Sequence, residues 1–554
     1  MKKFVFAVVI IIIAVTQFLA AQAQTQDALI GQITSAEEGA MEGVLVSAKR
    51  TGSTITISVV SDAQGRYSFP AARLEPGEYS LRIRAIGYDL DRPASVEVSG
   101  RQPVKFDINL RKTEDLAAQL TNAEWLASFP GSDQNKRALL GCIGCHSLER
   151  VARSQHKADD LVQVTLPRMQ GYVNQSIPAH PQLRRAERLM EERGDQRVHV
   201  YRGLADYLSS INLSSSAQWN YQFKTLARPT GRATRVVITE YDLPREVIEP
   251  HDVIVDEEGI AWYSSFGEQN LGRLDPKTGE VTEFPIPLHK PGFPTGLLGL
   301  RSDREGNLWL GNMYQGTIIK FDRKTKTFRF WPLPPEQNID AAQVNMVSPQ
   351  SSHVDGKVWA QNNGFAGVHR LDIATGQIET WEPFKNASKG EPHNIYDVIP
   401  DSKNNVYFTD FRQQHIGRID AKTGEIKLLT IPTPGSAPRR GMMDTQDRLW
   451  FGEFRGDRIG MLDTRTGQFK EWAVPMPWSN PYDVTIDKNE DAWAGSMNND
   501  RILRLNTKTG EFTSYLLPRS TNIRRVFVDN ASNPVTFWVG NNHGASIIKL
   551  EPID

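Results

Sequence analysis

Two cysteines and a histidine form the most distinctive chemical motif of this sequence. Cys142, Cys145 and His146 stand in one Cys-x-x-Cys-His string, and these are the only 2 cysteines of the chain. Two thiols one helical turn apart can add to the vinyl groups of a haem while the adjacent imidazole reaches the iron. A redox dithiol would expect a βαβ context, which the sequence lacks, and a zinc site would need two more soft ligands. The motif therefore predicts one covalently attached haem c.

The sixth ligand of that iron is left open among several residues. Met169, which ends a predicted helix before a proline-containing loop, is favoured over Met190, which lies 44 residues after His146. The remaining candidates are His156, His180 and His199. The stretch from Cys142 to Met169, with a closing Leu204-x-x-Tyr207-Leu208 helix, resembles cytochrome c domains. That resemblance implies electron transfer.

A second set of polar residues recurs where strand-like runs begin in the C-terminal half. Glu249-Pro250-His251 and Glu391-Pro392-His393 each bring an acid and an imidazole to such a start, and Arg439-Arg440, Tyr482 and Arg524-Arg525 occupy comparable starts. Histidines beside carboxylates suit proton transfer or metal binding, while arginines suit an anionic or polar ligand. The predicted catalytic residues are Glu249, His251, Glu391, His393, Arg439 and Arg440.

A repeat positions these residues. An aromatic residue recurs at spacings of 47, 50, 48, 43, 43 and 45, at Trp262, Trp309, Trp359, Tyr407, Trp450, Trp493 and Trp538. Seven units of this period, each with four strand-like runs, predict a seven-bladed β-propeller over residues 234–554. The run Thr234–Tyr241 looks like the fourth strand of a blade and should complete the last blade, which ends after its third strand.

The rim of the propeller follows from that count. In a four-stranded meander, the start of the inner strand and the end of the second strand lie on one face. Three residues past each aromatic, this face receives Ser265, Asn312, Asn362, Asp410, Glu453, Ser496 and Asn541. Asp410 and Glu453 are the predicted metal ligands there, beside the iron ligands His146 and Met169.

These repeats resemble the virginiamycin B lyase (streptogramin lyase) family across residues 234–554, through Pro-His-Asp-Val, Leu-Trp-x-Gly, Ile-Gly-Arg-Ile-Asp and Thr-Gly-Glu. The resemblance implies Mg-assisted elimination, with a histidine base and metal-holding glutamates near a Glu-x-His entrance. Ser265, 14 residues after His251, stands where a metal-binding glutamate would be wanted. Mg is therefore a possible second cofactor.

The segments before the propeller have different patterns. Residues 26–113 alternate apolar and polar residues and predict a small β-sandwich. Its Ser61-Asp62-x-x-Gly65-x-Tyr67-x-Phe69 run resembles the carboxypeptidase regulatory-like family, whose members usually serve as packing or adhesive modules. Residues 114–214 have helical periodicity over 135–145, 159–169, 182–192 and 199–211 and predict an α-helical cytochrome c domain. Residues 215–233 read as a linker. The predicted fold class is multidomain and mainly β, comprising the sandwich, the helical haem domain and the propeller.

Charge and targeting limit the partners. The 554 residues carry a formal net charge of -1, which gives no electrostatic case for nucleic acid or an anionic membrane. Residues 1–23 have the three regions of a signal peptide, with predicted cleavage after Ala23 and an uncleaved anchor as the alternative. The mature protein is expected to be periplasmic or secreted and bacterial.

Three functions remain open. The first is an exported haem-linked oxidoreductase that passes electrons to or from a substrate or redox partner bound at the propeller mouth. The second is an Mg-dependent carbon–oxygen lyase that uses His251 or His393 as the base. The third is a non-catalytic module that binds a surface glycan or a protein, with the haem serving only as a sensor. The expected partners are a periplasmic redox partner or a polar or anionic small-molecule or glycan ligand.

Overall fold

The computed structural model describes residues 27–100, 102–144, 146–165, 196–291, 293, 296–388 and 391–553. Its contacts divide the chain into two compact units. The first unit combines the residues up to Glu114 with Arg228–Thr239, and the second combines Asp115–Ala227 with Glu240–Ile553. The helical segment thus belongs to the same unit as the propeller.

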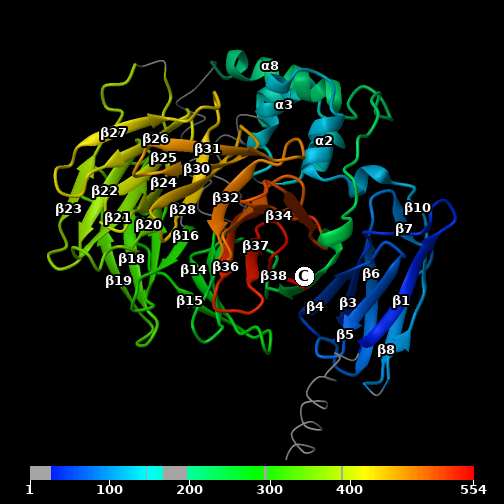
Figure 1. The fold of residues 1–554 in the computed structure, drawn as a ribbon. Helices are drawn as coiled ribbons and strands as arrows, with labels where there is room; N and C mark the ends of the chain where they lie inside the picture. Colours follow the sequence, from blue (N-terminus) through cyan, green and yellow to red (C-terminus); the bar gives the residue numbers. More distant parts are fainter. Residues whose placement is uncertain are drawn as a thin grey trace, which may run out of the picture. The chain divides into compact units, whose positions relative to one another are not determined.

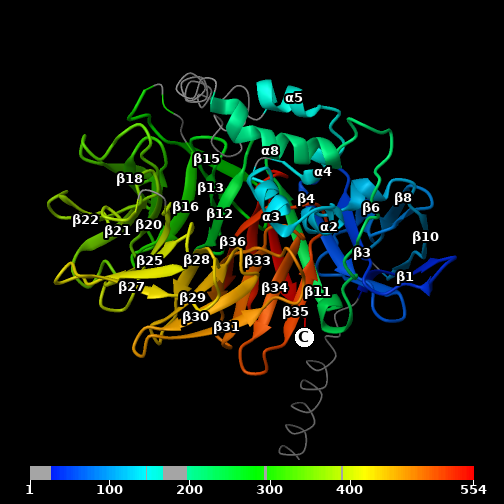
Figure 2. The same ribbon diagram turned by 90° about the horizontal axis from the view of Figure 1, so that it is seen from above.

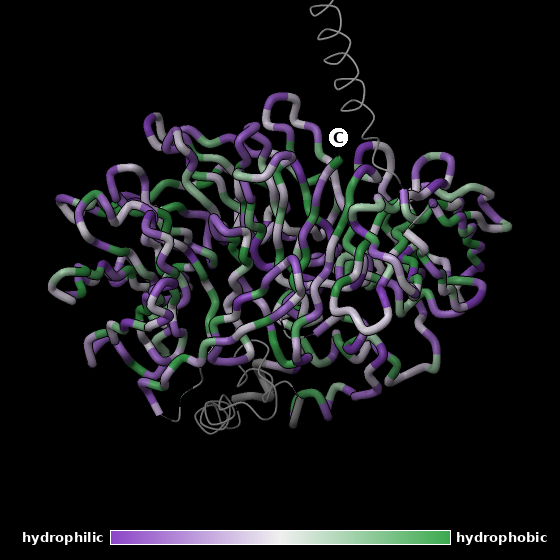
Figure 3. Tube along the Cα trace, turned by 90° about the horizontal axis from the view of Figure 1, so that it is seen from below, coloured by the Kyte–Doolittle hydropathy of each residue, from purple (hydrophilic) through white to green (hydrophobic). Residues whose placement is uncertain are grey.

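Figure 3 shows hydrophobic and hydrophilic residues alternating along many strands. No helix in the described part of the chain is long and apolar enough to cross a membrane.

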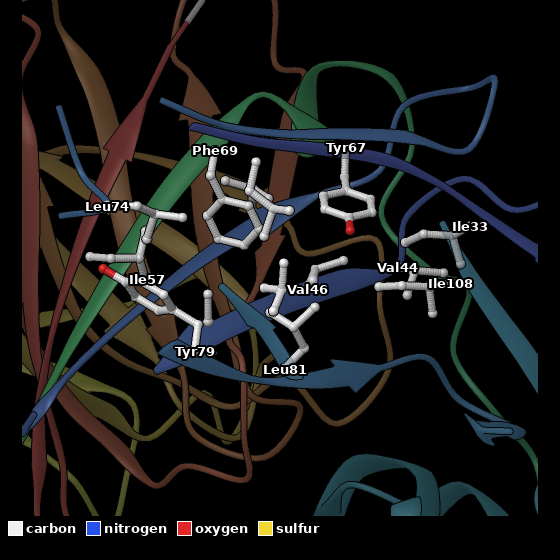
Figure 4. Close-up of a cluster of buried hydrophobic side chains, with 14 of the residues drawn as sticks. Ile33, Val44, Val46, Ile57, Tyr67, Phe69, Leu74, Tyr79, Leu81 and Ile108 are labelled. Atoms are coloured by element: carbon white, nitrogen blue, oxygen red, sulfur yellow. The ribbon is translucent and has the colours of Figure 1, made fainter. Parts of the chain in front are cut away.

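The first unit is built on short β-strands around one apolar core. Antiparallel ladders join β3 to β4 and β6, and β1 runs antiparallel to β5 and parallel to β10. Leu29, Val46 and Phe69 are fully buried in the core drawn in Figure 4. The strands are β1 (Asp27–Ser35), β2 (Gly39–Ala40), β3 (Leu45–Arg50), β4 (Ile55–Val60), β5 (Arg66–Pro70), β6 (Gly77–Arg84), β7 (Tyr88–Leu90), β8 (Ala94–Val98), β9 (Val104–Lys105) and β10 (Ile108–Lys112).

The turn before β5 explains one run of the N-terminal sequence pattern. The Asp62 carboxylate accepts hydrogen bonds from the backbone amides of Gln64 and Arg66, each 2.9 Å long. Gly65 has a φ of +71°, and a Cβ there would lie 2.6 Å from the carbonyl oxygen of Ile33. Only glycine satisfies both the left-handed backbone and this close approach. The turn therefore fixes the register in which Tyr67 and Phe69 face the core.

Seven successive four-stranded antiparallel meanders make up the propeller in the described part of the chain (Figure 1). The inner strand of the first blade contacts the inner strands of both the second and the last blade, so the ring closes. The last blade has the order β36-β37-β38-β11, which confirms that the strand preceding the repeats completes it. The blades are β12 (Pro250–Val255), β13 (Ala261–Ser265), β14 (Asn270–Leu274), β15 (Val281–Pro285); β16 (Leu297–Ser302), β17 (Leu308–Asn312), β18 (Thr317–Asp322), β19 (Thr327–Pro332); β20 (Val344–Ser348), β21 (Lys357–Asn362), β22 (Gly367–Asp372), β23 (Ile378–Trp381); β24 (Ile395–Pro400), β25 (Val406–Asp410), β26 (His415–Ile419), β27 (Ile426–Thr430); β28 (Pro438–Met443), β29 (Arg448–Glu453), β30 (Arg458–Asp463), β31 (Gln468–Ala473); β32 (Pro481–Ile486), β33 (Asp491–Ser496), β34 (Arg501–Asn506), β35 (Phe512–Leu516); and β36 (Ile523–Asp529), β37 (Thr536–Asn541), β38 (Ser546–Pro552), β11 (Val236–Asp242).

The repeated tryptophan ties two strands of a blade to their connecting turn. Trp493 donates its indole N–H to the Asp487 carboxylate over 2.9 Å, and that carboxylate also accepts the backbone amides of Asn489 and Asp491. The pairs Asp256–Trp262, Asp303–Trp309 and Asp444–Trp450 repeat the bond at 2.7–2.9 Å. Because one aspartate satisfies both the turn and the buried indole, the recurrence of these residues is architectural.

The helical segment of the second unit lies over one end of the propeller strands (Figures 1 and 2). Its helices are α2 (Asn122–Ser128), α3 (Asp133–Ala138), α4 (Leu148–Ala152), α5 (Ala158–Asp160) and α8 (Gln196–Ile211), with tighter or wider turns η1 (Leu116–Gln119), η2 (Leu139–Gly141) and η3 (Leu161–Thr165). A further turn, η4 (Gly231–Thr234), belongs to the first unit. The ring of Trp125 in α2 packs against Trp219 and Phe223 at 5.7 and 5.3 Å. Residues from the predicted linker thus build the apolar core of this segment.

These observations correct the predicted fold class. The protein is mainly β, and the predicted α-helical cytochrome c domain over residues 114–214 is wrong. Within residues 115–165 and 196–214 the helices have 3 to 7 residues apart from α8, which has 16. The helix predicted over residues 135–145 ends at Ala138 and continues as the η2 turn. Of the one predicted over 159–169, the described part, 159–165, comprises the end of α5 and the η3 π-turn. The helix predicted over 182–192 lies outside the described residues.

The indole–carboxylate bond gives the first prediction. Trp493→Phe should lower the free energy of unfolding by about 2–3 kcal/mol, because it removes a hydrogen bond to a charged acceptor and leaves the buried carboxylate short of a donor. Trp472→Phe is the matched control, since that half-buried ring stacks on Trp450 at 5.6 Å on the outer part of a blade. Denaturant unfolding followed by circular dichroism measures both. Equal losses in the two variants would contradict the role given to the bond.

Candidate functional site

The mouth of the propeller is the rim where inner strands begin and second strands end. Pro250 pairs with Ser265, Ile395 with Asp410, and the other blades follow as Leu297–Asn312, Val344–Asn362, Pro438–Glu453, Pro481–Ser496 and Ile523–Asn541. The structure therefore brings the sequence-derived rim positions to one face. In every blade the register shifts just inside this rim, and such bulges redirect side chains.

His251 lies inside the channel rather than at the rim. Its side chain is fully buried, with Nδ1 2.8 Å from the Asp252 carboxylate and Nε2 3.2 Å from the hydroxyl of Tyr482. Burial lowers the pKa of His251 to about 3, although Asp252 opposes the shift, so the imidazole is neutral at physiological pH. Both ring nitrogens are engaged within the protein. The predicted base His251 is thus a member of a buried polar network.

Below His251, a network of aspartates and arginines crosses the channel. Asp252 receives two hydrogen bonds from Arg440, at 2.6 and 2.7 Å, and one of 3.1 Å from Arg525. Burial opposes ionisation of Asp252, but Arg440 outweighs it and holds the pKa of this carboxyl well below its usual range. Arg440, a predicted catalytic residue, is fully buried in this pair. The channel network comprises Asp252, Arg301, Asp397, Arg440, Asp483 and Arg525.

The two Glu-Pro-His strings are not equivalent in the structure. His251 directly follows the first residue of its inner strand, whereas His393 precedes Ile395, the first residue of its own inner strand, by two positions. His393 Nδ1 lies 2.6 Å from the Asp410 carboxylate, and its ring stacks on Phe384 at 3.9 Å. Its Nε2 is buried and has no hydrogen-bond partner among the described residues. His393, unlike His251, therefore keeps one imidazole nitrogen without a hydrogen-bond partner among the described residues.

Arg439 lies in an aromatic box next to this histidine's blade. Its guanidinium carbon is 3.9 to 4.7 Å from the ring centres of Tyr482, Phe454, Phe411 and Tyr396. One of its nitrogens donates to the hydroxyl of Tyr396 over 3.1 Å. Burial raises the pKa of Tyr396, but the charge of Arg439 and a hydrogen bond with Tyr482 outweigh it and lower the pKa overall. The box fixes the guanidinium with its Nε unpaired among the described residues.

Arg455 lies close enough to three other arginines to interact with their charges. We call Arg137, Arg412, Arg439 and Arg455 the arginine cluster. Burial and the nearby charges of Arg412, Arg137 and Arg439 lower the pKa of Arg455, which shows that these cations repel one another. Arg137 and Arg455 also line a cavity of about 270 Å³ with Asp133, Leu140, Asp457, Pro477, Trp478 and Asn480. The Asp457 carboxylate accepts hydrogen bonds from the backbone amides of Trp478 and Asn480, at 3.0 and 2.7 Å.

The acids at the mouth do not assemble into a metal site. Asp410 accepts hydrogen bonds from His393 and from the backbone of Asn394. Glu453 is fully buried, and burial together with Glu471 raises its pKa to about 9, so it is protonated at neutral pH. Burial likewise raises the pKa of Glu249 well above its usual value, and Glu391 is exposed on a loop. Across the residues that the structure describes, no three His, Cys, Asp or Glu side chains could together hold a metal ion.

The Cys142–His146 segment contacts the propeller mouth through main-chain atoms. Carbonyl oxygens of Ile143 and Gly144 accept hydrogen bonds from Asn522 and Arg524 at the mouth, at 3.1 and 3.2 Å, and Gly144 O lies 3.3 Å from His543 Nε2. Burial and the charge of Arg524 lower the pKa of His543 to about 3. His146 Nδ1 lies 2.8 Å from the carbonyl of Ser147. Main-chain atoms of this segment therefore complete the hydrogen bonds of the mouth.

The predicted cofactors are corrected accordingly. The donor set does not fit haem c held by Cys142, Cys145, His146 and Met169, or Mg held by Asp410 and Glu453, because no metal-holding group exists among the described residues. Cys145 and Met169, and the alternative ligands Met190 and His180, lie outside those residues, as does the side chain of His199. The family that matches the propeller, given below, is a lyase family. The predicted electron transfer depended on the haem and is corrected with it.

Sequence reasoning missed two arginines and a histidine at the mouth, although the signal was present. Arg412 and Arg455 each lie five residues after the repeated aromatic of their blade, and His543 occupies the same position in the last blade. The count used for the rim stopped three residues after the aromatic. Extending it by two positions would have found these residues. The contribution of Arg137 from α3 has no comparable sequence signal.

Comparisons with known proteins bear on both units. Residues 389–552 match the model of the Virginiamycin B lyase family, and residues 28–111 match that of the Carboxypeptidase regulatory-like domain. These matches confirm both resemblances over those residues. No curated protein matches the chain.

Among solved structures, the second unit's relatives include virginiamycin B lyase from Staphylococcus aureus, with 23% identity and a TM-score of 0.48 over 57% of this chain and 100% of that one. A streptogramin B lyase structure has 22% identity and a TM-score of 0.48 over 58% of this chain and 99% of that one. The extracellular domain of the one-component system BT4673 from B. thetaiotaomicron has 16% identity and a TM-score of 0.42 over 56% of this chain and 40% of that one.

Glu453 gives a pH prediction. Since its folded-state pKa of about 9 exceeds the unfolded value, the folded state binds more protons than the unfolded state between about pH 5 and 9. Stability from this group is complete below about pH 4 and is lost as the pH rises. Glu453→Gln should therefore be more stable than the natural protein by about 2 kcal/mol at pH 7 and equally stable near pH 4. Thermal unfolding at several pH values measures this; a difference independent of pH would contradict it.

Proposed function

We propose that the propeller mouth between blades four and five binds an anionic small molecule or an acidic glycan, and that the protein is an exported binding protein of this specificity. The arginine cluster carries the proposal. None of its four guanidinium groups has a carboxylate within ion-pair distance among the described residues, although the chain as a whole balances its charges. Export rests on the predicted signal peptide, which lies outside the described residues.

The positive charges of the arginine cluster repel one another in the free protein. Like charges held close together raise the free energy of the free site, so an arriving carboxylate, sulfate or phosphate relieves repulsion as well as forming hydrogen bonds. Guanidinium groups suit such anions because they offer two parallel donors. Trp478, half-buried in the cavity wall beside Arg137 and Arg455, supplies an apolar face on which a sugar ring can pack. These features support an acidic glycan as the ligand.

The first test measures binding of acidic oligosaccharides by calorimetry, with polygalacturonate and heparin fragments as probes. Arg412→Ala combined with Arg455→Ala should weaken binding at least about tenfold, because each lost charge-assisted hydrogen bond contributes about 1.5–3 kcal/mol. Binding should also weaken with added salt. Arg329→Ala is the matched control, since that arginine lies on an outer strand over Trp331. Affinity unchanged in the double variant would overturn the proposal.

A second candidate function at the same mouth is metal-free elimination of a carbon–oxygen bond. The partnerless Nε2 of His393, with Nδ1 held by Asp410, supports it. In such a step Nε2 takes a proton from the carbon beside a carboxylate or ester, the electron pair forms a carbon–carbon double bond, and the bond to the neighbouring oxygen breaks. The imidazolium then returns the proton to the departing oxygen. The arginine cluster would stabilise the negative charge that develops on the carboxylate.

The elimination candidate has its own test. With the same acidic oligosaccharides, a new conjugated double bond should appear as ultraviolet absorbance in the natural protein. His393→Gln should reduce its rate of formation by about 100-fold or more, in the range of general base catalysis, while calorimetric affinity stays nearly constant. His353→Gln, an exposed histidine away from the mouth, is the control. Tight binding without any absorbance change would leave only the binding function.

A further inference from the structure

A second cavity lies at the opposite end of the propeller from the mouth. Its volume is about 450 Å³, and residues at the far ends of the inner strands line it, among them Pro400, Met443, Ile486 and Val528. Six of the seven blades contribute to the lining. We call this cavity the funnel. Its volume falls within the roughly 300–1,000 Å³ of small-molecule sites.

The channel network separates the funnel from the mouth. Arg301 and Arg525 line the funnel and also belong to the network. Arg301 makes two hydrogen bonds of 2.8 Å to Asp397, and Arg525 donates to Asp252 and to the carbonyl of Leu300. Because these side chains are buried and mutually bonded, they close the inner end of the funnel. A ligand here would be independent of one bound at the mouth.

Two polar groups at the inner part of the funnel are left without partners. The Thr485 hydroxyl belongs to a residue that is 5% exposed, and Arg301 Nε belongs to one that is 4% exposed. Neither atom has a hydrogen-bond partner among the described residues. A buried donor left without a partner costs free energy, so both groups favour a ligand that brings an acceptor.

The carboxylates that line the funnel already accept hydrogen bonds from neighbouring parts of the fold. Asp444 accepts hydrogen bonds from the backbone of Gln446 and Arg448 and from the indole of Trp450. Asp401 likewise accepts hydrogen bonds from two backbone amides of its own turn. Asp447 accepts hydrogen bonds from the backbone amide and the hydroxyl of Ser402. Arg304, in contrast, is exposed at the edge. Among the buried polar atoms of the lining, Thr485 Oγ1, Arg301 Nε and Arg525 Nε, all of which can donate, have no hydrogen-bond partner in the described part of the chain.

The walls between these polar groups are apolar. Met442, Met443, Ile486 and Phe527 face the cavity, and the methionines and phenylalanine are only partly buried. Methionine side chains adapt to ligands of irregular shape. We propose that the funnel is a second ligand site, which takes a small organic acid with its carboxylate or sulfonate toward Thr485 and Arg301 and its apolar body against the methionines.

The test uses 8-anilinonaphthalene-1-sulfonate, an aromatic sulfonate whose fluorescence rises on binding. The natural full-length protein should show one saturable site. Thr485→Val, which keeps the shape and removes the hydroxyl, should weaken binding about tenfold, and Met443→Trp, which fills the cavity, should abolish it. The controls are Thr513→Val and Met461→Trp, on strands that do not line the funnel. The double variant Arg412→Ala with Arg455→Ala should bind the dye normally.

Each result decides the proposal. Loss in the funnel variants with normal binding in the controls, and unchanged thermal unfolding of Thr485→Val, supports it. Absence of saturable binding, or equal affinity in Thr485→Val and the natural protein, overturns it whatever Met443→Trp does. Dye binding that falls only in the arginine double variant would place the dye at the mouth and also overturn the funnel site, while leaving the proposed function intact.

Discussion

The buried charge network in the propeller channel is the constraint on which the arrangement of both ends depends. Asp252 comes from the first blade, Arg440 from the fifth and Arg525 from the seventh; Asp252 and Arg440 are fully buried where they meet, and Arg525 is largely buried. Burying such charges is costly, and their attraction offsets the cost only when geometry and hydrogen bonding are good. The inner strands must therefore close at one spacing and register. The network fixes which side chains can reach solvent at either end.

That constraint explains why two histidines of similar local sequence differ chemically. His251 stands one residue before Asp252, so Asp252 engages one of its ring nitrogens while Tyr482 engages the other, and burial keeps the imidazole neutral. His393 stands outside its inner strand, where Asp410 holds one nitrogen and leaves the other without a partner. Orientation by a carboxylate is what a general base requires, and it is compatible with reactivity only when the second nitrogen remains available. Position along the channel decides the difference.

The repeat made the propeller predictable, while the site depended on details that a repeat does not contain. Trp493 and three of its counterparts mark their blades because each bonds a buried indole to the aspartate of the preceding turn, so their spacing reports the architecture directly. Strand closure by β11 was predictable for the same reason, since the last blade lacked a strand. By contrast, Glu391-Pro392-His393 repeats the letters of Glu249-Pro250-His251 in a different register, and one sequence cannot reveal where a strand begins to within two residues. The pairing of Arg440 with Asp252, 188 residues away, is likewise invisible locally.

The helical segment shows that a local sequence motif can suggest the wrong domain when the segment folds only by packing against residues distant in the sequence. Cys142 and His146 suggested a self-contained haem domain, but the described helices are short and their apolar faces are completed by Trp219 and Phe223. Short helices are marginal by themselves and gain stability from packing. Here the packing partners include the propeller, because Gly144 accepts from Arg524 and the backbone of Ala123 donates to that of Asn498. The mouth is consequently divided: blades six and seven are engaged by this segment, and the unpaired arginines remain at blades four and five, where a ligand can still gain from them.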